Sequence, residues 1–426
     1  MNKIFLLCML ALVAAGTSPA QTNVSGALYS NTTWTAANSP YIVTANVIVF
    51  DGVQLTIEPG VTVKFDDNTM LELRGKLVAN GTAANHIIFT SNNASPARNI
   101  WQGIKATNGN SITGGQITMT YCEGKYAREF LDLDLAYHGP YTFRHCYFFQ
   151  NTDVNWDSSP GTLFDSCTFE SNYRAFEGGQ FDATVQNSTF INNETGAYSG
   201  HVYNCSFTGH TNVAVYAYID VDHCEVYNNA VGIRSDDHAD TKVTNNYVHD
   251  NNIGVEIDRF WNEPGIIFKH NKICNNATWN VQYDYTNNAD LTENCWCSLD
   301  SAFIRSKIRD GYVNTSYGLV TFDINGNCDI AGLVTTNIPP GPVQQTYNIS
   351  LAPNPFTDHA SLNFDVMNGH DYEVLVTDQL GRLKIHRQHV SASPVAIDRG
   401  SLAPGIYFVQ LRDNGKIIAN RKLSAL

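Results

Sequence analysis

The sequence predicts an all-β protein in which a right-handed parallel β-helix is followed by a small β-sandwich. Three observations support this prediction. A short internal repeat fills the middle of the chain, the composition is rich in Asn, Gly, Tyr and Phe, and the pattern changes after a proline-rich stretch near residue 340. Residues of these types favour turns and short strands over helices.

The repeat is clearest between residues 185 and 258. Three segments there, VQNSTFINNETGAYSG, VDHCEVYNNAVGIRSD and VTNNYVHDNNIGVEID, share one order of apolar positions, an Asn pair and a final alternating strand. The fourth residue of this frame recurs nine times at a mean spacing of 21.5 residues, at Cys122, Cys146, Cys167, Ser188, Cys205, Cys224, Asn246, Asn271 and Asn294. Such a unit leaves room for three short strands and three turns. It cannot bury its apolar face alone, so we expect successive units to stack as coils.

The charge pattern limits the possible partners. Charged residues make up 15% of the 426 residues, and the formal net charge of −14 arises within residues 21–346. An acidic surface argues against a nucleic-acid partner. Metal cations or neutral sugars fit it better.

The chain begins with the features of a secretory signal in residues 1–20: Lys3, an apolar core from Ile4 to Ala15, and a small-residue cleavage site ending at Ala20. No later segment is long and apolar enough to span a membrane. Residues 21–336 are predicted to form the β-helix, and short alternating strands with Asp-Gly, Pro-Gly and Asn-Gly turns already fill residues 21–110. Near residues 295–330 the repeat breaks and apolar residues take a helical spacing, which predicts a cap over the open end of the stack.

A second region follows the proline-rich segment NIPPGPVQQT, residues 337–346, which we interpret as a linker. Residues 347–426 show short strands of period two between Gly, Pro and Asn turns. This pattern is typical of a small β-sandwich.

Several motifs resemble known families. LTIEPGVTVKF, LRGKLVANG and IWQGI resemble the opening coils of secreted bacterial right-handed parallel β-helix proteins, which are similar in fold to the pectate-lyase superfamily. That resemblance implies a fold more than an activity, because the fold hosts many functions. SLAPNPFTD, VLVTDQLGRL, LAPGIYFVQL and the final RKL resemble the type A C-terminal sorting domain of type IX secretion cargo in Bacteroidetes. The second resemblance implies that the secretion machinery recognises residues 347–426, and that the protein reaches the outer-membrane surface or the medium after loss of this domain.

Nine cysteines remain after the signal. Five share the repeat position named above and are predicted to be buried thiols, although pairing among them is an alternative. Aligning the last coils places Cys274 and Cys297 at one position of adjacent coils, about 4.8 Å apart. That distance is within reach of a disulfide. Cys295, on the opposite side of its strand, is predicted to pair with Cys328.

Outward columns of side chains are the places where such a stack would carry chemistry, because no short catalytic motif is present. The coils can be aligned on Val215, Ile233, Val255 and Val281. This alignment gives one column of Tyr218, Asp236, Asp258 and Asp284, preceded by a column of Tyr216, Arg234, Glu256 and Gln282. His238, Arg259, Trp261 and Tyr285 lie nearby in the sequence, and Trp156 on an earlier coil is a further candidate for stacking on a sugar.

Two interpretations of the Asp column stay open. Carboxylates about 5 Å apart suit the pair of a retaining glycosidase. Asp236 and Asp258 would also suit a Ca²⁺ ion, and the resemblance to pectate lyases then makes Arg259 or His238 the candidate base. The alternative is that each Asp ends its strand as a turn residue.

The sequence therefore leaves two functions. The first is a non-catalytic exported protein that binds glycans or protein partners through the long side of the β-helix. The second is a secreted polysaccharide lyase or glycoside hydrolase that uses the Asp column. The lack of a complete set of carboxylates and base favours the first, and the stacked Asp residues favour the second.

Overall fold

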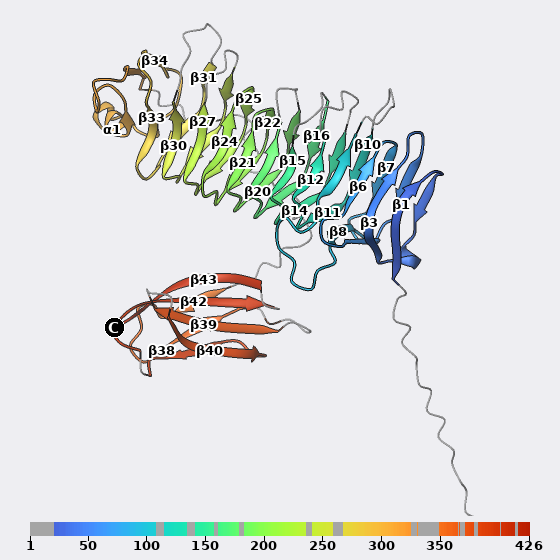
Figure 1. Ribbon diagram of the computed structural model, residues 1–426. Helices are drawn as coiled ribbons and strands as arrows, with labels where there is room; N and C mark the ends of the chain where they lie inside the picture. Colours follow the sequence, from blue (N-terminus) through green and yellow to red (C-terminus); the bar gives the residue numbers. More distant parts are fainter. Residues whose placement is uncertain are drawn as a thin grey trace, which may run out of the picture. The chain divides into compact units, whose positions relative to one another are not determined.

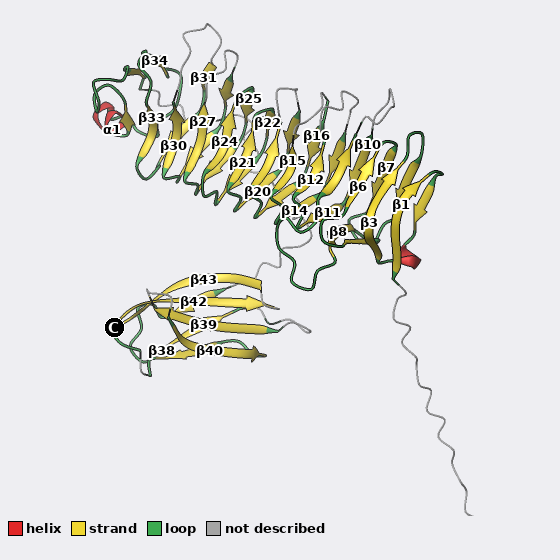
Figure 2. Cartoon of the chain, viewed as in Figure 1, coloured by secondary structure: helices red, strands yellow, loops and turns green. Residues whose placement is uncertain are grey.

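The computed structural model describes residues 21–107, 115–133, 141–156, 161–178, 183–235, 241–258, 267–324, 330, 349–364, 366, 371–378, 382–400, 402–413 and 416–426. The described residues between 21 and 324 form a parallel β-helix whose coils stack in chain order (Figure 1). Among the described elements only η1 (Ala36–Asn38) and α1 (Ser301–Ser306) are helical (Figure 2). The predicted fold class, a right-handed parallel β-helix followed by a small β-sandwich, is confirmed.

Each coil contributes a strand to each of three faces. The first face contains β5 (Thr62–Phe65), β8 (Ile87–Ser91), β11 (Cys122–Lys125), β14 (Tyr147–Phe149), β17 (Thr168–Glu170), β20 (Thr189–Ile191), β23 (Ser206–Thr208), β26 (Glu225–Tyr227), β29 (Tyr247–His249) and β32 (Lys272–Cys274). The second contains β6 (Met70–Leu73), β9 (Gly103–Ala106), β12 (Glu129–Asp132), β15 (Asp153–Trp156), β18 (Arg174–Glu177), β21 (Thr195–Tyr198), β24 (Val213–Ala217), β27 (Val231–Ser235), β30 (Ile253–Ile257), β33 (Trp279–Tyr283) and β35 (Ile308–Arg309).

The third face contains β2 (Thr32–Trp34), β4 (Gln54–Ile57), β7 (Lys76–Asn80), β10 (Gln116–Thr120), β13 (Thr142–Arg144), β16 (Leu163–Asp165), β19 (Thr184–Gln186), β22 (His201–Tyr203), β25 (Asp220–Asp222), β28 (Lys242–Thr244) and β31 (Ile267–Lys269). The longer strands β1 (Thr22–Leu28) and β3 (Tyr41–Val49) join the first two faces into one 23-stranded sheet.

The core of the helix consists of inward columns of apolar side chains. Phe169, Phe190 and Phe207 stack from coil to coil with ring centroids 4.5 and 4.4 Å apart. Val215, Ile233, Val255 and Val281 are in register on the second face, as the sequence alignment predicted. All four are buried, so the alignment of the coils is correct.

The corner between the third and first faces holds the predicted repeat position. The residue before it adopts a positive φ, between 48° and 64° from Tyr121 to Glu293, which explains why Asn, His and Ser recur there. The five cysteines of the ladder are buried free thiols. This confirms the prediction, and the alternative of disulfides among them is wrong. Burial raises the pKa of Cys122, Cys167 and Cys205.

The corner between the first and second faces holds a second ladder, which the sequence analysis did not identify as such. Its rungs are Asn151, Asn172, Asn193, His210, Asn229, Asn251 and Asn276, all buried. The Nδ2 groups of Asn151, Asn172, Asn229 and Asn251 each donate to Oδ1 of the Asn on the next coil at 2.8–3.1 Å, and that Oδ1 also accepts the backbone N–H of the earlier residue. His210 takes one Asn position. The ladder satisfies buried polar groups that the turn would otherwise leave unpaired.

The third corner, between the second and third faces, varies in length along the stack. Two residues, Ser199 and Gly200, connect β21 to β22, and two connect β24 to β25, whereas the nine residues 258–266 connect β30 to β31. One long connection, residues 92–102 between β8 and β9, lies instead at the corner between the first and second faces. Connections of variable length on a rigid scaffold commonly carry function.

The C-terminal end of the stack is covered by β34 (Ala289–Asp290), α1 and β36 (Val320–Thr321). Asp300 caps α1 by accepting from the backbone N–H groups of Ala302 and Phe303. Asp310 is fully buried and binds Arg305 at 2.6 Å and the backbone N–H of Val320 at 2.9 Å. These contacts close the edge that the last coil would otherwise leave unpaired.

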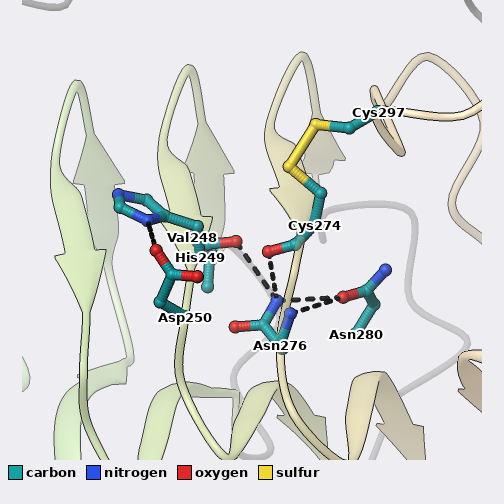
Figure 3. Close-up of a disulfide and its surroundings, with 7 residues drawn as sticks. All are labelled: Val248, His249, Asp250, Cys274, Asn276, Asn280 and Cys297. Atoms are coloured by element: carbon teal, nitrogen blue, oxygen red, sulfur yellow. Dashed lines mark hydrogen bonds and ion pairs between the residues drawn. A yellow bond between two sulfur atoms is a disulfide. The ribbon is translucent and has the colours of Figure 1, made fainter.

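A disulfide joins Cys274 on β32 to Cys297 in the cap, the pair that the alignment of the coils predicts (Figure 3). Their Cα atoms lie 5.8 Å apart. Cys295 is also disulfide-bonded, and its predicted partner, Cys328, lies outside the described residues.

Replacing both Cys274 and Cys297 by serine is expected to lower the free energy of unfolding by about 3 kcal/mol, because the bridge closes a loop of 23 residues. Thermal or denaturant unfolding of the double variant without reductant measures this loss. Unchanged stability would mean that the bridge adds nothing to the cap.

The chain divides into two compact units between Gly341 and Pro342, within the segment predicted as a linker. The second unit has an antiparallel sheet of β37 (Ser350–Ala352), β38 (His359–Asn363) and β41 (Val395–Asp398), and another in the order β40 (Leu383–Val390), β39 (Tyr372–Asp378), β42 (Gly405–Asp413), β43 (Lys416–Ala425). It has a hydrophobic core of its own around Tyr372, Val374 and Leu423.

Because each unit has its own core, we expect a chain truncated at Gly341 to fold as a β-helix. Its circular dichroism should remain that of a β protein, and its unfolding should remain cooperative with a midpoint close to that of the longer chain. Loss of β structure in the truncated chain would show that the two units depend on each other.

Candidate functional site

One column of register positions runs along the second face. Strand pairing aligns the following residues on successive coils: Lys105, Asp132, Trp156, Glu177, Tyr198, Tyr216, Arg234, Glu256, Gln282 and Arg309. We call this set the second-face column. It contains the predicted column of Tyr216, Arg234, Glu256 and Gln282 and extends it over further coils in both directions.

The residues predicted as a catalytic column follow directly after these strands. Tyr218, Asp258, Asp284 and Tyr285 are described, and Trp156 ends β15 on the same face. Asp236, His238, Arg259 and Trp261 lie outside the described residues. The complete Asp column therefore stays a prediction.

Arg234 is the centre of the polar contacts on the described coils. Its Nε donates to Glu256 Oε2 at 2.6 Å and lies 3.9 Å from Asp258 Oδ2, and its Nη1 donates to the Tyr216 hydroxyl at 2.9 Å. Partial burial raises the pKa of Glu256, and the charges of Asp258 and Asp284 add to this, while Arg234 opposes it. The carboxylate of Glu256 is thus held by an arginine of the preceding coil.

Asp284 is held in the same way by the following coil. Arg309 Nη1 donates to Asp284 Oδ2 at 2.9 Å. Gln282 Nε2 donates to that same oxygen at 3.0 Å and to Glu256 Oε1 at 3.1 Å, so the amide links the two carboxylates. The other oxygen of Asp284 is buried without a hydrogen-bond partner among the described residues.

The N-terminal part of the face repeats this arrangement. Lys105 Nζ lies 2.5 Å from Asp132 Oδ2 on the next coil. Arg174 Nε donates to the buried Asp153 at 2.6 Å, and its Nη1 lies 3.4 Å from Glu177. Each of these basic groups is therefore bound to a carboxylate. Ion pairs between partly buried groups of this geometry are stronger than exposed ones.

Between the two charged parts lie two tyrosines. The rings of Tyr198 and Tyr216 have centroids 5.0 Å apart, with Tyr198 39% exposed. The guanidinium group of Arg234 lies over the ring of Tyr216 at 5.3 Å. Their two strands, β21 and β24, are each followed by a two-residue connection.

Sequence reasoning missed Tyr198 and Arg309. Tyr198 falls in register with Tyr216, so carrying the alignment one coil further would have found it. Arg309 pairs with Gln282 from within the cap, where the repeat no longer sets the frame. Nothing in the spacing of the repeat points to Arg309.

The described part of the chain contains no group of three or more His, Cys, Asp and Glu side chains that could hold a metal ion. The predicted Ca²⁺ ligand Asp258 is described, and it lies beside Arg234. The second predicted ligand, Asp236, is outside the described residues.

Comparison with known families gives one match in the β-helix and one in the C-terminal unit. Residues 26–122 match the pectate-lyase-like beta helix domain, and residues 340–424 match the secretion system C-terminal sorting domain. The fold and these matches define a parallel β-helix protein that carries a sorting domain. Residues 26–122 thus match the pectate-lyase-like β-helix domain within a longer β-helix, and the sorting domain indicates export by type IX secretion to the cell surface or the medium.

Individual relatives are distant. Protein bark beetle of Drosophila melanogaster is 34% identical over 83 residues, which cover 18% of this chain and 3% of that protein. The A-module of the mannuronan C-5 epimerase AlgE4 of Azotobacter vinelandii is 14% identical, with a TM-score of 0.32, over 65% of this chain and 79% of that chain. No helix within the described ranges has the length and apolar character needed to cross a membrane.

Proposed function

We propose that this exported protein binds glycans through the second-face column and does so without catalysis. The observation that carries the proposal is the pair Tyr198 and Tyr216, placed in register on adjacent coils in the middle of a long polar column. Aromatic faces beside polar side chains are the usual elements of a site that holds an extended polar ligand. The sorting domain supports a location where such a ligand is met.

Ion pairing of the carboxylates supports binding over catalysis. A general acid or base must exchange its proton with a substrate. Glu256 and Asp284 instead accept hydrogen bonds from Arg234, Arg309 and Gln282, so that three of their four oxygens already have a donor within the protein.

Replacing Tyr198 or Tyr216 by alanine is expected to weaken glycan binding about three- to tenfold, since an aromatic contact contributes roughly 0.5–1.5 kcal/mol beyond its buried area. Calorimetry with the mature protein and soluble oligosaccharides measures this. Tyr29→Ala is the matched control, because Tyr29 is 75% exposed and lies on the first coil, away from the column. Equal affinity of all three variants and the wild type would contradict the proposal.

The second candidate is a polysaccharide lyase or glycoside hydrolase. Asp258 and Asp284 follow adjacent strands of the second face, and Asp258 keeps 42% of its side chain exposed. Release of unsaturated products or new reducing ends from a polysaccharide, abolished by Asp258→Asn or Asp284→Asn, would favour this candidate over binding alone.

A further inference from the structure

We infer that the ligand of the second-face column is a neutral glycan and not a polyuronate or another anionic polymer. This inference rests on the proposed function and concerns which class of glycan the column accepts. It follows from the pairing of the basic groups and from the charge of the positions beside the column.

The basic groups of the column already form ion pairs with carboxylates of the protein. Lys105 binds Asp132, Arg234 binds Glu256, and Arg309 binds Asp284. A uronate that takes the place of the paired carboxylate must displace a side chain that is only 11–21% exposed. Separating a partly buried pair leaves an uncompensated charge, which is strongly unfavourable.

The charge balance of the face also opposes an anionic ligand. Within the column, Lys105, Arg234 and Arg309 are matched in number by Asp132, Glu177 and Glu256. The described ionisable neighbours beside it include two basic residues, Arg128 and Arg174, and four acidic residues, namely Glu129, Asp153, Asp258 and Asp284. Burial raises the pKa of Glu129, and the charges of Asp132 and Asp153 add to this while Arg128 and Lys105 oppose it. A polyanion would therefore meet net repulsion along the face.

The hydroxyl groups of a neutral sugar can bind without breaking these ion pairs and without charge repulsion. A carboxylate in an ion pair keeps acceptor capacity on its oxygens, and a guanidinium group has five N–H donors, three of which Arg234 directs at Glu256 and Tyr216. A neutral sugar can bond both members of a pair without separating them while its ring lies on Tyr198 or Tyr216. The column is suited to neutral sugars because its charges are already satisfied.

The test compares the mature protein with soluble neutral oligosaccharides and with oligogalacturonates at low and high salt. We expect binding of a neutral glycan with an affinity that changes less than twofold between 50 and 500 mM salt, and at least tenfold weaker binding of the uronate. Salt strongly screens interactions of an exposed polyanion. Uronate binding that is as tight as neutral binding and falls with salt would overturn the inference.

A second experiment tests whether variants gain affinity for oligogalacturonate. Glu256→Gln keeps the shape of the side chain and releases the charge of Arg234, so we expect oligogalacturonate affinity to rise by at least fivefold. Asp284→Asn, which releases Arg309, provides an independent variant if the first does not fold. Glu293→Gln is the matched control, since Glu293 pairs with Lys269 away from the second face, and it should leave uronate binding unchanged.

The possible results distinguish the inferred class of glycan from the proposed glycan-binding function on which that inference rests. Uronate binding by the wild type that Tyr198→Ala weakens would overturn the neutral class and keep the site. Failure of both glycan classes to bind, with Tyr198→Ala without effect, would overturn the proposed function itself. No gain of uronate binding by either charge variant, in folded protein, would also count against the inference.

Discussion

Replacing Asn251 by alanine is expected to lower the free energy of unfolding by about 4 kcal/mol. Oδ1 of Asn251 accepts from the backbone N–H and the Nδ2 group of Asn229 at 3.0 and 2.8 Å. Its Nδ2 group donates to Val226 O at 2.9 Å and to Asn276 Oδ1 at 3.0 Å. Removing the amide leaves several buried groups unpaired, each at a cost of about 1–3 kcal/mol. Denaturant unfolding measures the loss.

The adjacent residue supplies the control. Asn252 is exposed, and its Oδ1 accepts one hydrogen bond, from Thr278 Oγ1 at 2.7 Å. We expect Asn252→Ala to change stability by less than about 0.5 kcal/mol, as for most surface substitutions. Similar losses in the two variants would mean that the ladder does not stabilise the stack.

Acidification is expected to weaken the fold through His210. The ring lies fully inside the Asn ladder, and burial lowers the pKa of His210 to about 4, although the hydrogen bond to Asn229 opposes this. Nδ1 lies 2.8 Å from Asn229 Oδ1, and Nε2 lies 3.4 Å from the Nδ2 group of Asn193. The neutral ring fits with its proton on Nδ1. A second proton on Nε2 would face the amide donor of Asn193.

The sign of the effect follows from the lowered pKa. The unfolded chain binds the proton first, near pH 6.5, so the contribution of His210 is complete above that pH and is lost as the pH falls toward 4. The loss amounts to about 2.5 kcal/mol by pH 4.5, at 1.36 kcal/mol for each pKa unit.

His210→Asn is the matched variant because asparagine occupies the other rungs of the ladder. Unfolding of the wild type and of His210→Asn should be compared between pH 7 and pH 4.5. We expect the difference in stability between the two to shift by the stated amount. A difference that stays constant with pH would show that His210 does not titrate on unfolding.

The fold was largely predictable from the sequence because each coil repeats the same physical requirement. A small residue at the Cys122-to-Asn294 position fits a tight corner, and the residue before it must adopt a positive φ. These requirements restrict which residue types can occupy the corner positions of each coil. Because these positions recur at a regular spacing, the repeat can be recognised in the sequence. The pairing of Cys274 with Cys297 could be anticipated because it joins equivalent positions of two coils.

The candidate site was less predictable because its contacts cross coils at one face and end in the cap. The alignment located Arg234, Glu256 and Gln282 as neighbours. It did not show that Arg234 and Arg309 bind the carboxylates, since pairing depends on which side chain bends toward which coil. The role of His210 was hidden for a related reason. Spacing showed an Asn pair on other coils, and a single His in that place has no repeat of its own.

The end of the Asn ladder has a consequence for the length of the molecule. Asn276 donates from its backbone N–H and its Nδ2 group to Oδ1 of Asn280, only four residues further along, where earlier rungs bind a whole coil away. Each coil thus adds one rung to the ladder, and Asn280 is the acceptor that ends it. Asn280 and the disulfide-linked cap lie in the final turns, and the ladder contacts of the described interior coils are alike from coil to coil. We therefore expect that whole coils of 21 residues, such as the one between Asn172 and Asn193, can be added or removed without changing either end.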